Sequence, residues 1–326
     1  MNNTSNFSGG NYLFFHGTIS EGGNKMKKIV SMLLISVFLF ACSNSAIERE
    51  DHNNGKISSS SKSNKVYEYD IYVKKCACKL RVKNYLNLNK EEINRFNKEL
   101  ESAVIYLNKN YKEFIQKKDI YYITLHDGDG ISYSNGSSVH YYRYLEKRAP
   151  IIHELSHAMF GYDPNHGSFT QEGLALNIQY KYKEYLFPNE DIPIHHLMKY
   201  FIDNEYYIPL DKLTNENISN SLFEVNNNEV LSWISYVEAG SFSTYLIDRY
   251  GIQKYALIYN QLSISARVQE VYKKSLKDLE KEWLIYVDEK GSTEDVKKLI
   301  EKPYYSNLNN KLMTLDFPEK LDNLNE

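Results

Sequence analysis

The sequence predicts an α+β fold, in which a small strand-containing part, residues 66–145, precedes a mostly helical part, residues 146–290. Two observations lead to this prediction. Before Pro150, short runs rich in tyrosine, isoleucine and valine are separated by turn-forming residues, as in β-strands. After Pro150, apolar residues recur at the spacing typical of helices. The 326 residues, 42% of them hydrophobic, are enough to bury one large core or two modest ones.

The strand-containing part begins with a strand and a long helix. In VYEYDIYV, Val66–Val73, apolar and aromatic residues alternate with acidic ones, and Leu80–Val82 either continue this strand or form its partner. Asn89 followed by Glu92 is a signal for the start of a helix, and apolar residues then recur at helical spacing over Ile93–Phe114. We therefore expect an amphipathic helix after the first strand or strand pair.

The remaining elements follow in order. IYYITL, Ile120–Leu125, predicts a further strand, and Ile131–Tyr133 and Val139–Tyr142 are candidate edge segments. Helices are expected around Ile151–Phe160, Thr170–Leu186, Ser241–Tyr250, Gln253–Leu262 and Arg267–Val287. Residues 291–326 become polar and poorly periodic from about Lys302, which predicts a peripheral C-terminal tail.

Residues 26–41 are typical of a secretion signal. Two lysines precede an apolar run, Ile29–Ala41, which is shorter than the roughly 20 residues of a membrane-spanning helix. The run ends in Leu-Phe-Ala-Cys, which resembles a bacterial lipobox, so Cys42 is the expected site of lipidation; a secretion signal without lipid is the alternative. Translation is then expected to start at Met26, with residues 1–25 an upstream mis-assignment, and the polar residues 42–65 form a flexible tether.

Charge and cysteine content narrow the function classes. The net charge is only −3, and acidic and basic residues are interspersed, so the sequence has no basic stripe. We therefore expect no nucleic-acid partner. The folded part contains Cys76 and Cys78, and C-x-C alone cannot form a tetrahedral thiolate site. Whether these two cysteines form a local disulfide stays open at this point.

The strongest chemical signal is H-E-x-x-H, formed by His153, Glu154 and His157. Pro150 suits the first turn of a helix, so both histidines are expected on one helix face, one turn apart, in position to share a zinc ion. Glu154 lies beside that face and can act as a general base. The alternative is a pair of ordinary helix histidines, and a third ligand decides between the two because catalytic zinc sites keep three protein ligands.

Two residues could provide this third ligand. His166 lies in the following loop, as in metzincins, but Gly161 and His166 both come later than that pattern requires. Glu172, in FTQEGLAL, begins the next predicted helix. Two antiparallel helices joined by the short loop GYDPNHGS would bring Glu172 back over the histidine pair, so we expect Glu172 to complete a His2Glu zinc site.

At these residues the chain resembles a known family. HELSH followed by a short loop and E-G-x-A is similar to the gluzincins, the peptidase MA-like superfamily that includes thermolysin and the aminopeptidases. Ser235–Gly251 and Val271–Val287 look like the closing helices of bacterial MA-like domains, so the resemblance covers about Ile120–Val287. It implies a zincin-like fold and a zinc-dependent peptidase.

The resemblance also implies a role for one tyrosine. In the aminopeptidase relatives, a tyrosine shortly before a Gly-Ser or Gly-Ala pair donates its hydroxyl to the developing oxyanion, and Tyr236 is the matching residue. In one respect the chain departs from the pattern: Leu176 stands where thermolysin-like enzymes carry a carboxylate that supports a histidine. Support for the histidines must therefore come from elsewhere.

These observations predict a lipid-anchored, extracytoplasmic zinc metallopeptidase with peptide or protein substrates. An exposed strand within Ile131–Tyr142 is expected to hold an extended peptide by strand addition. The main alternative is a surface lipoprotein whose zincin fold binds a protein or cell-wall partner without cleaving it; the general base Glu154 argues against this. A substrate-binding lipoprotein for transport is a third possibility, which the lack of two similar α/β lobes disfavours.

Overall fold

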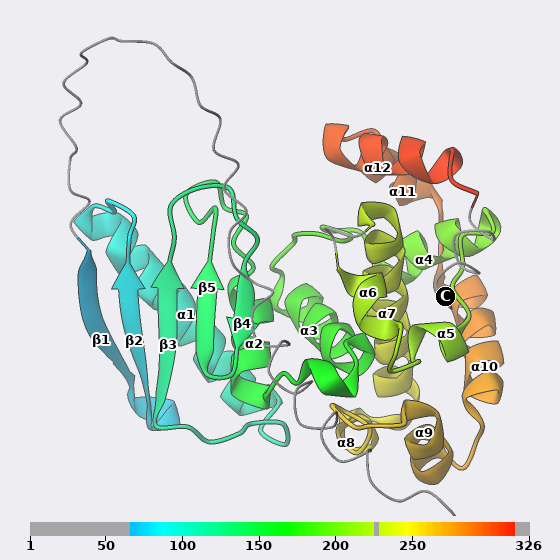
Figure 1. The fold of residues 1–326 in the computed structure, drawn as a ribbon, viewed down its shortest axis with the longest axis horizontal. Coiled ribbons are helices and arrows are strands. Elements are labelled where there is room, and N and C mark those ends of the chain that lie inside the picture. The colour runs from blue at the N-terminus through cyan, green and yellow to red at the C-terminus, as the bar shows by residue number, and fades with distance from the viewer. Residues whose placement is uncertain (1–65, 225–227, 317–326) are drawn as a thin grey trace, which may run out of the picture. The chain divides into compact units, whose positions relative to one another are not determined.

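A five-stranded mixed sheet occupies the N-terminal part of the computed structural model, which describes residues 66–224 and 228–316 (Figure 1). The strands are β1 (Tyr67–Val73), β2 (Cys78–Asn84), β3 (Ile120–Leu125), β4 (Tyr133–Asn135) and β5 (Ser138–Tyr141). They lie in the order β1-β2-β3-β5-β4, in which β2, β3 and β5 are parallel and the two edge strands are antiparallel to their neighbours. The strand predicted at Ile120–Leu125 coincides with β3.

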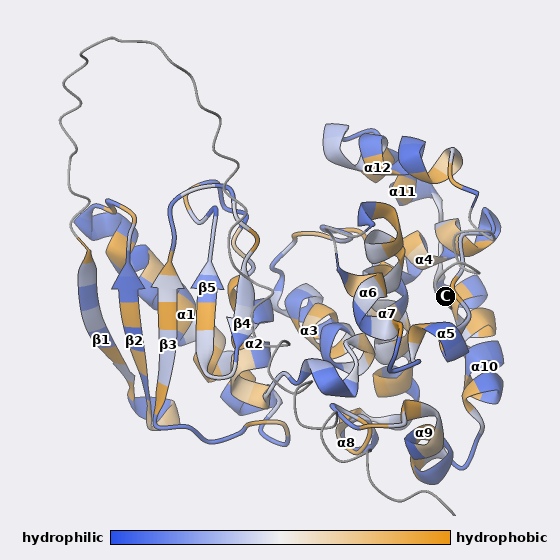
Figure 2. Cartoon of the chain, in the orientation of Figure 1, coloured by the Kyte–Doolittle hydropathy of each residue, from blue (hydrophilic) through white to orange (hydrophobic). Residues whose placement is uncertain are grey.

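Helix α1 (Lys90–Asn110) connects the parallel strands β2 and β3. Its predicted start is confirmed: the Asn89 side chain accepts the N–H groups of Glu91 and Glu92, and the Glu92 carboxylate accepts the N–H of Asn89. Along the strands, inward residues such as Leu80 and Ile123 are fully buried, and Figure 2 shows apolar bands crossing strands that are otherwise polar. One face of the sheet is therefore core, as the alternating pattern predicts.

The helical part begins with α2 (Ile151–Phe160) and α3 (Phe169–Tyr182), and α3 packs against the long helix α7 (Glu229–Tyr250). The other helices are α4 (Ile194–Asp203), α5 (Leu210–Leu213), α6 (Ser219–Phe223), α8 (Ile252–Ala256), α9 (Ile264–Tyr272), α10 (Leu276–Lys290), α11 (Glu294–Ile300) and α12 (Pro303–Met313). Because α2 contacts β4 and β5 as well as α3, it links the sheet to the helices. The predicted α+β class is confirmed at this level.

Several helix boundaries differ from the prediction. α7 begins at Glu229, well before the expected start at Ser241, because it is buried on almost every side and shows no polar face to reveal its period. The helix expected over Arg267–Val287 is two helices, α9 and α10, separated at Lys273, which has a left-handed φ of 58°.

The C-terminal stretch is not a peripheral tail as far as it is described. Residues 303–313 form α12, in which Tyr305, Leu308 and Leu312 are buried, and this helix packs against α7. A period of three to four residues is present there, but polar residues between the apolar ones hide it. Cys76, in the turn between β1 and β2, and Cys78, the first residue of β2, are free thiols, and no disulfide joins them.

The chain divides into two units, Met1–Ser61 and Lys62–Glu326, and all described residues belong to the second. The expected upstream segment 1–25, signal 26–41, lipidation site Cys42 and tether 42–65 therefore lie outside the described residues. Within residues 66–224 and 228–316, none of the helices combines the length and apolar character needed to cross a membrane.

Candidate metal centre

Helix α2 presents its two histidines as the sequence predicts. The helix begins directly after Pro150, and His153 and His157 lie one turn apart with their side chains buried. The start of the helix is tied to the sheet, because the hydroxyl of Tyr141 in β5 donates to the carbonyl of Ile151 at 2.7 Å. The sheet thus fixes the position of the helix that carries H-E-x-x-H.

The connection between α2 and α3 is shaped by one buried side chain, Gln171. Its Oε1 accepts the N–H of Asp163 at 2.8 Å, and its Nε2 donates to the carbonyls of Asp163 and Gly167 at 2.9 and 2.7 Å. This short loop returns the chain beside α2. Glu172, the next residue, lies in the first turn of α3.

A glycine allows α3 to approach α7 closely. A Cβ at Gly173 would lie 2.5 Å from the carbonyl oxygen of Ala239 and 2.0 Å from Oγ of Ser243, both in α7. No larger residue fits there without moving the helices. The E-G pair therefore combines a carboxylate that faces α2 with a contact that holds its helix against α7.

Three side chains converge on one point between α2 and α3. Nε2 of His153 lies 3.1 Å from Oε2 of Glu172, Nε2 of His157 lies 3.4 Å from the same oxygen, and the two Nε2 atoms are 3.2 Å apart. These separations are edges of a tetrahedron whose centre is about 2.0 Å from each atom, the length of a zinc–nitrogen or zinc–oxygen bond. Among the described residues, this is the one His/Cys/Asp/Glu group able to hold a metal ion, so the donor set fits zinc.

The two carboxylates at the centre have opposite electrostatic surroundings. Burial raises the pKa of Glu154 to about 7, with His153 opposing the increase and the charges of Glu172 and Glu184 adding to it. Burial also raises the pKa of Glu172, but the imidazoles of His157 and His153 outweigh it and lower the pKa to about 2. Glu172 is therefore an anion suited to a metal, whereas Glu154 exchanges a proton near neutral pH.

Tyr236 in α7 lies near both carboxylates. Burial raises its pKa well above the usual range, and the charges of Glu172 and Glu154 contribute to this increase. Its ring packs edge-on against Phe223, with ring centroids 5.2 Å apart. The ring also packs edge-on against Phe187, with centroids 5.9 Å apart, so aromatic contacts hold Tyr236 in place.

Tyr162 also lies at the centre, although no sequence pattern indicates it. Its ring lies edge-on against the ring of His157, with centroids 5.0 Å apart. The hydroxyls of Tyr162 and Ser168 are hydrogen-bonded at 3.0 Å, and Ser168 donates to Asn220 Oδ1, so Tyr162 is the donor of the pair. No motif marks this tyrosine, because its place depends on the course of the loop.

His166, the alternative third ligand, lies outside the cluster. Its Nδ1 is 2.9 Å from the backbone carbonyl of Asn260, and Asn260 in turn donates from its side chain to the carbonyl of Gly161 at 2.8 Å. His166 therefore anchors the loop between α2 and α3.

The side chain at position 176, which the sequence singles out as a place for a supporting carboxylate, is a leucine. Nδ1 of His153 and Nδ1 of His157 are both buried and have no hydrogen-bond partner among the described residues. Leu176 cannot accept a hydrogen bond. Other contacts must therefore set the position of α2 relative to Glu172.

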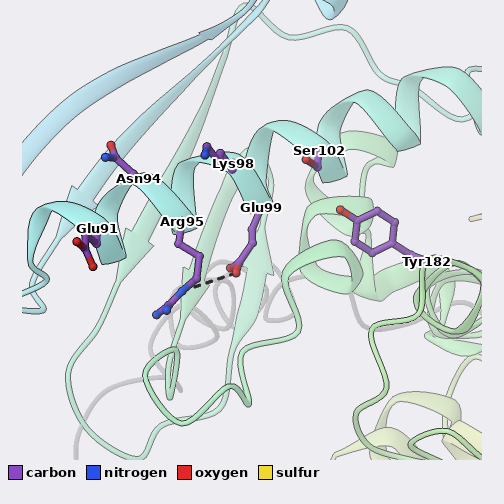
Figure 3. A pocket seen from close by; sticks show the side chains of 7 residues that line it. All are labelled: Glu91, Asn94, Arg95, Lys98, Glu99, Ser102 and Tyr182. Carbon is purple, nitrogen blue, oxygen red and sulfur yellow. Dashed lines mark ion pairs between the residues drawn. The ribbon is translucent and has the colours of Figure 1, made fainter.

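Two surface depressions lie away from the candidate ligands. One of about 500 Å³ is lined by side chains of α1, including the ion pair of Arg95 and Glu99, with Tyr182 facing them (Figure 3). The other, of about 520 Å³, shares these three residues and extends to Ile151 and Glu184. Neither is lined by the converging histidines.

Comparisons with known proteins show a distant likeness in structure. The chain matches no protein-family model and no curated protein. Among solved structures, it is similar to a mutant M1 zinc metallopeptidase from Deinococcus radiodurans, with a TM-score of 0.42 and 11% sequence identity over 68% of this chain and 52% of that one. The chain thus spans about half the length of that structure.

Proposed function

We propose that this chain is a zinc-dependent metallopeptidase of the gluzincin type, with a zincin-like fold. One observation carries the proposal: the Nε2 atoms of His153 and His157 and Oε2 of Glu172 converge at tetrahedral spacing, with Glu154 buried beside them. A His2Glu set leaves a fourth position for water, as catalytic zinc sites require. The residue pattern and the geometry thus support the same chemistry.

His153, His157 and Glu172 would hold the metal. When bound, zinc would polarise the scissile carbonyl and make a water molecule acidic. The chain's own part begins with Glu154, whose carboxylate takes the proton of the attacking water and later passes it to the leaving amine. Its pKa of about 7 suits both steps, because the group gains and loses a proton with similar ease near neutral pH.

Tyr236 and β4 would act on the substrate. The phenol of Tyr236 is positioned near the two carboxylates and donates a hydrogen bond to the oxygen on which negative charge develops. β4 is an edge strand that packs against α2, so an extended peptide can add to it and pass along the centre. In strand addition the peptide is bound through its backbone hydrogen bonds, and its side-chain specificity is set by separate contacts.

A peptide-library digestion by the full chain tests the activity. The parent protein should cleave peptides, and a zinc chelator should stop cleavage. Glu154→Gln should keep zinc, because the amide is nearly isosteric, yet turnover should fall by about 10²- to 10⁴-fold since an amide cannot accept the proton. Cleavage by Glu154→Gln at the parental rate would rule out this mechanism.

We also propose that the protein is held at the outer face of the cell membrane by lipid on Cys42. The support is the lysine-flanked apolar run that ends in Leu-Phe-Ala-Cys. Cys42→Ser should release the protein from the membrane fraction and leave catalysis unchanged, because the polar residues 42–65 separate this site from the folded part. Persistent membrane association with an uncleaved signal would favour a secretion signal without lipid.

A further inference from the structure

The first turn of α2 is capped by a residue from far along the chain. Oε1 of Glu184 accepts the N–H of Ile152 at 3.1 Å. Burial raises the pKa of this carboxyl to about 7, and the N–H groups of Ile152, His153 and Ile151 oppose the increase. The local N-cap, Pro150, has no side chain that could accept these N–H groups. Glu184 therefore takes the place of a helix cap for the helix that carries both histidines.

The end of α3 delivers Glu184 to this position. Lys183 ends the helix in a left-handed conformation with φ of 67°, and the N–H of Glu184 returns to the carbonyl of Gln179 at 3.0 Å. The chain thereby turns back toward α2. Glu172 lies in the first turn of α3 and Glu184 lies just beyond its end. The two ends of α3 thus bring carboxylates to α2 at two places, the histidine side chains and the backbone of the first turn.

A ligand-binding role for Glu184 does not agree with the geometry. Glu184 lines the depression of about 520 Å³, but its second oxygen, Oε2, is buried and has no hydrogen-bond partner among the described residues. A molecule in the depression cannot reach a buried oxygen. The contacts that Glu184 makes are with the helix.

We propose that Glu184 is a positioning residue for the metal centre. By capping the first turn of α2, it fixes the backbone of His153, whose Nδ1 has no acceptor among the described residues to hold the ring. A ligand histidine is usually oriented by a hydrogen bond that its ring N–H donates to a neighbouring acceptor. His153 is instead held through the backbone of its helix turn, which Glu184 caps. The inference rests on the proposed function where it concerns zinc.

Two substitutions separate the cap from other effects. Glu184→Gln keeps an oxygen that can accept the N–H of Ile152, whereas Glu184→Met has a similar length and removes the acceptor. Zinc affinity is measured by competition with a chelator, and amide hydrogen exchange is measured at Ile152 and His153. The Met variant should bind zinc about 10- to 100-fold more weakly and exchange faster at these amides, and the Gln variant should stay close to the parent.

Asn89→Ala is the matched control, because it removes the cap of α1 and should cost similar stability without affecting zinc affinity. Parental zinc affinity in Glu184→Met, or equal weakening in Asn89→Ala, would overturn the proposal. If the Met variant does not fold, Glu184→Asp, which keeps the charge but withdraws the oxygen by one methylene, should show the same weakening, and parental affinity there would also overturn it. A parent chain that binds no zinc would instead refute the proposed function.

Discussion

Helices α3 and α7 pack together and each carries a buried glutamate, yet the pKa values of the two carboxyls are shifted in opposite directions. Glu172 in α3 has its pKa lowered to about 2, whereas burial raises the pKa of Glu238 in α7 well above its usual range. Around Glu172, two imidazole nitrogens lie within 3.4 Å of one carboxylate oxygen. Among the described residues, Glu238 accepts a hydrogen bond only from the N–H of Ile208, at 2.8 Å, and the charge of Glu280 adds to the increase in its pKa.

The difference shows that burial alone does not make a metal ligand. A carboxylate withdrawn from water stays charged only where positive or donating groups compensate for lost hydration. Glu172 has that compensation from α2, so it is available as an anion. Glu238 lacks such compensation, so burial raises its pKa, and it acts as a hydrogen-bond acceptor for the chain before α5.

The largest effect should come from removing the charge of Glu172. Glu172→Gln should weaken zinc binding by more than about 100-fold and abolish turnover, since loss of even an outer-shell partner costs 10- to 100-fold. Glu238→Gln is the control from the compared helix and should keep zinc fully, as should His166→Ala. Metal analysis of the purified proteins decides; zinc lost in His166→Ala and retained in Glu172→Gln would assign the third ligand to His166.

Tyr236→Phe should have the next largest effect. If the hydroxyl stabilises charge that develops only in the transition state, kcat should fall by about 10²- to 10³-fold with KM much less changed. Zinc content should not change. Tyr245→Phe is a matched control in the same helix, because the hydroxyl of Tyr245 donates to Glu282 instead of facing the centre. A parental kcat in Tyr236→Phe would remove this tyrosine from the mechanism.

The sequence predicts the centre better than it predicts the helices that surround it. His153, His157 and Glu172 follow from motif and spacing, because a helix pair joined by a short loop leaves little choice of geometry. The sequence places the start of α7 too late, since a helix buried on almost every side has no polar face to show its period. Glu184 could not be predicted, because its contact depends on where α3 ends and how Lys183 turns the chain.

A moderate effect is expected at the contact that joins the two compared helices. Gly173→Ala places a Cβ against the Ala239 carbonyl, which is backbone and cannot swing aside, so α3 must move. Overpacking of this kind costs about 1–3 kcal/mol in the free energy of unfolding, measurable by urea denaturation. Zinc affinity should fall as well, because Glu172 moves with its helix. Unchanged stability and zinc affinity would show that the helices tolerate the added methyl group.

The smallest functional effect is expected for Glu238→Gln, which tests whether Glu238 is neutral. The folded-state pKa of Glu238 lies above its unfolded value, so its contribution to stability is complete below the unfolded pKa and is lost as pH rises toward the folded pKa. A glutamine at this position does not ionise, so it loses no stability as pH rises, and it can still accept the N–H of Ile208.

At pH 5 the parent and Glu238→Gln should have similar free energies of unfolding. Toward pH 8 the free energy of unfolding of the variant should rise relative to that of the parent by at most about 1.4 kcal/mol per pH unit. Turnover and zinc content should stay parental. Urea denaturation at both pH values checks this, and identical pH dependence of the two proteins would show that Glu238 is ionised like an exposed carboxylate.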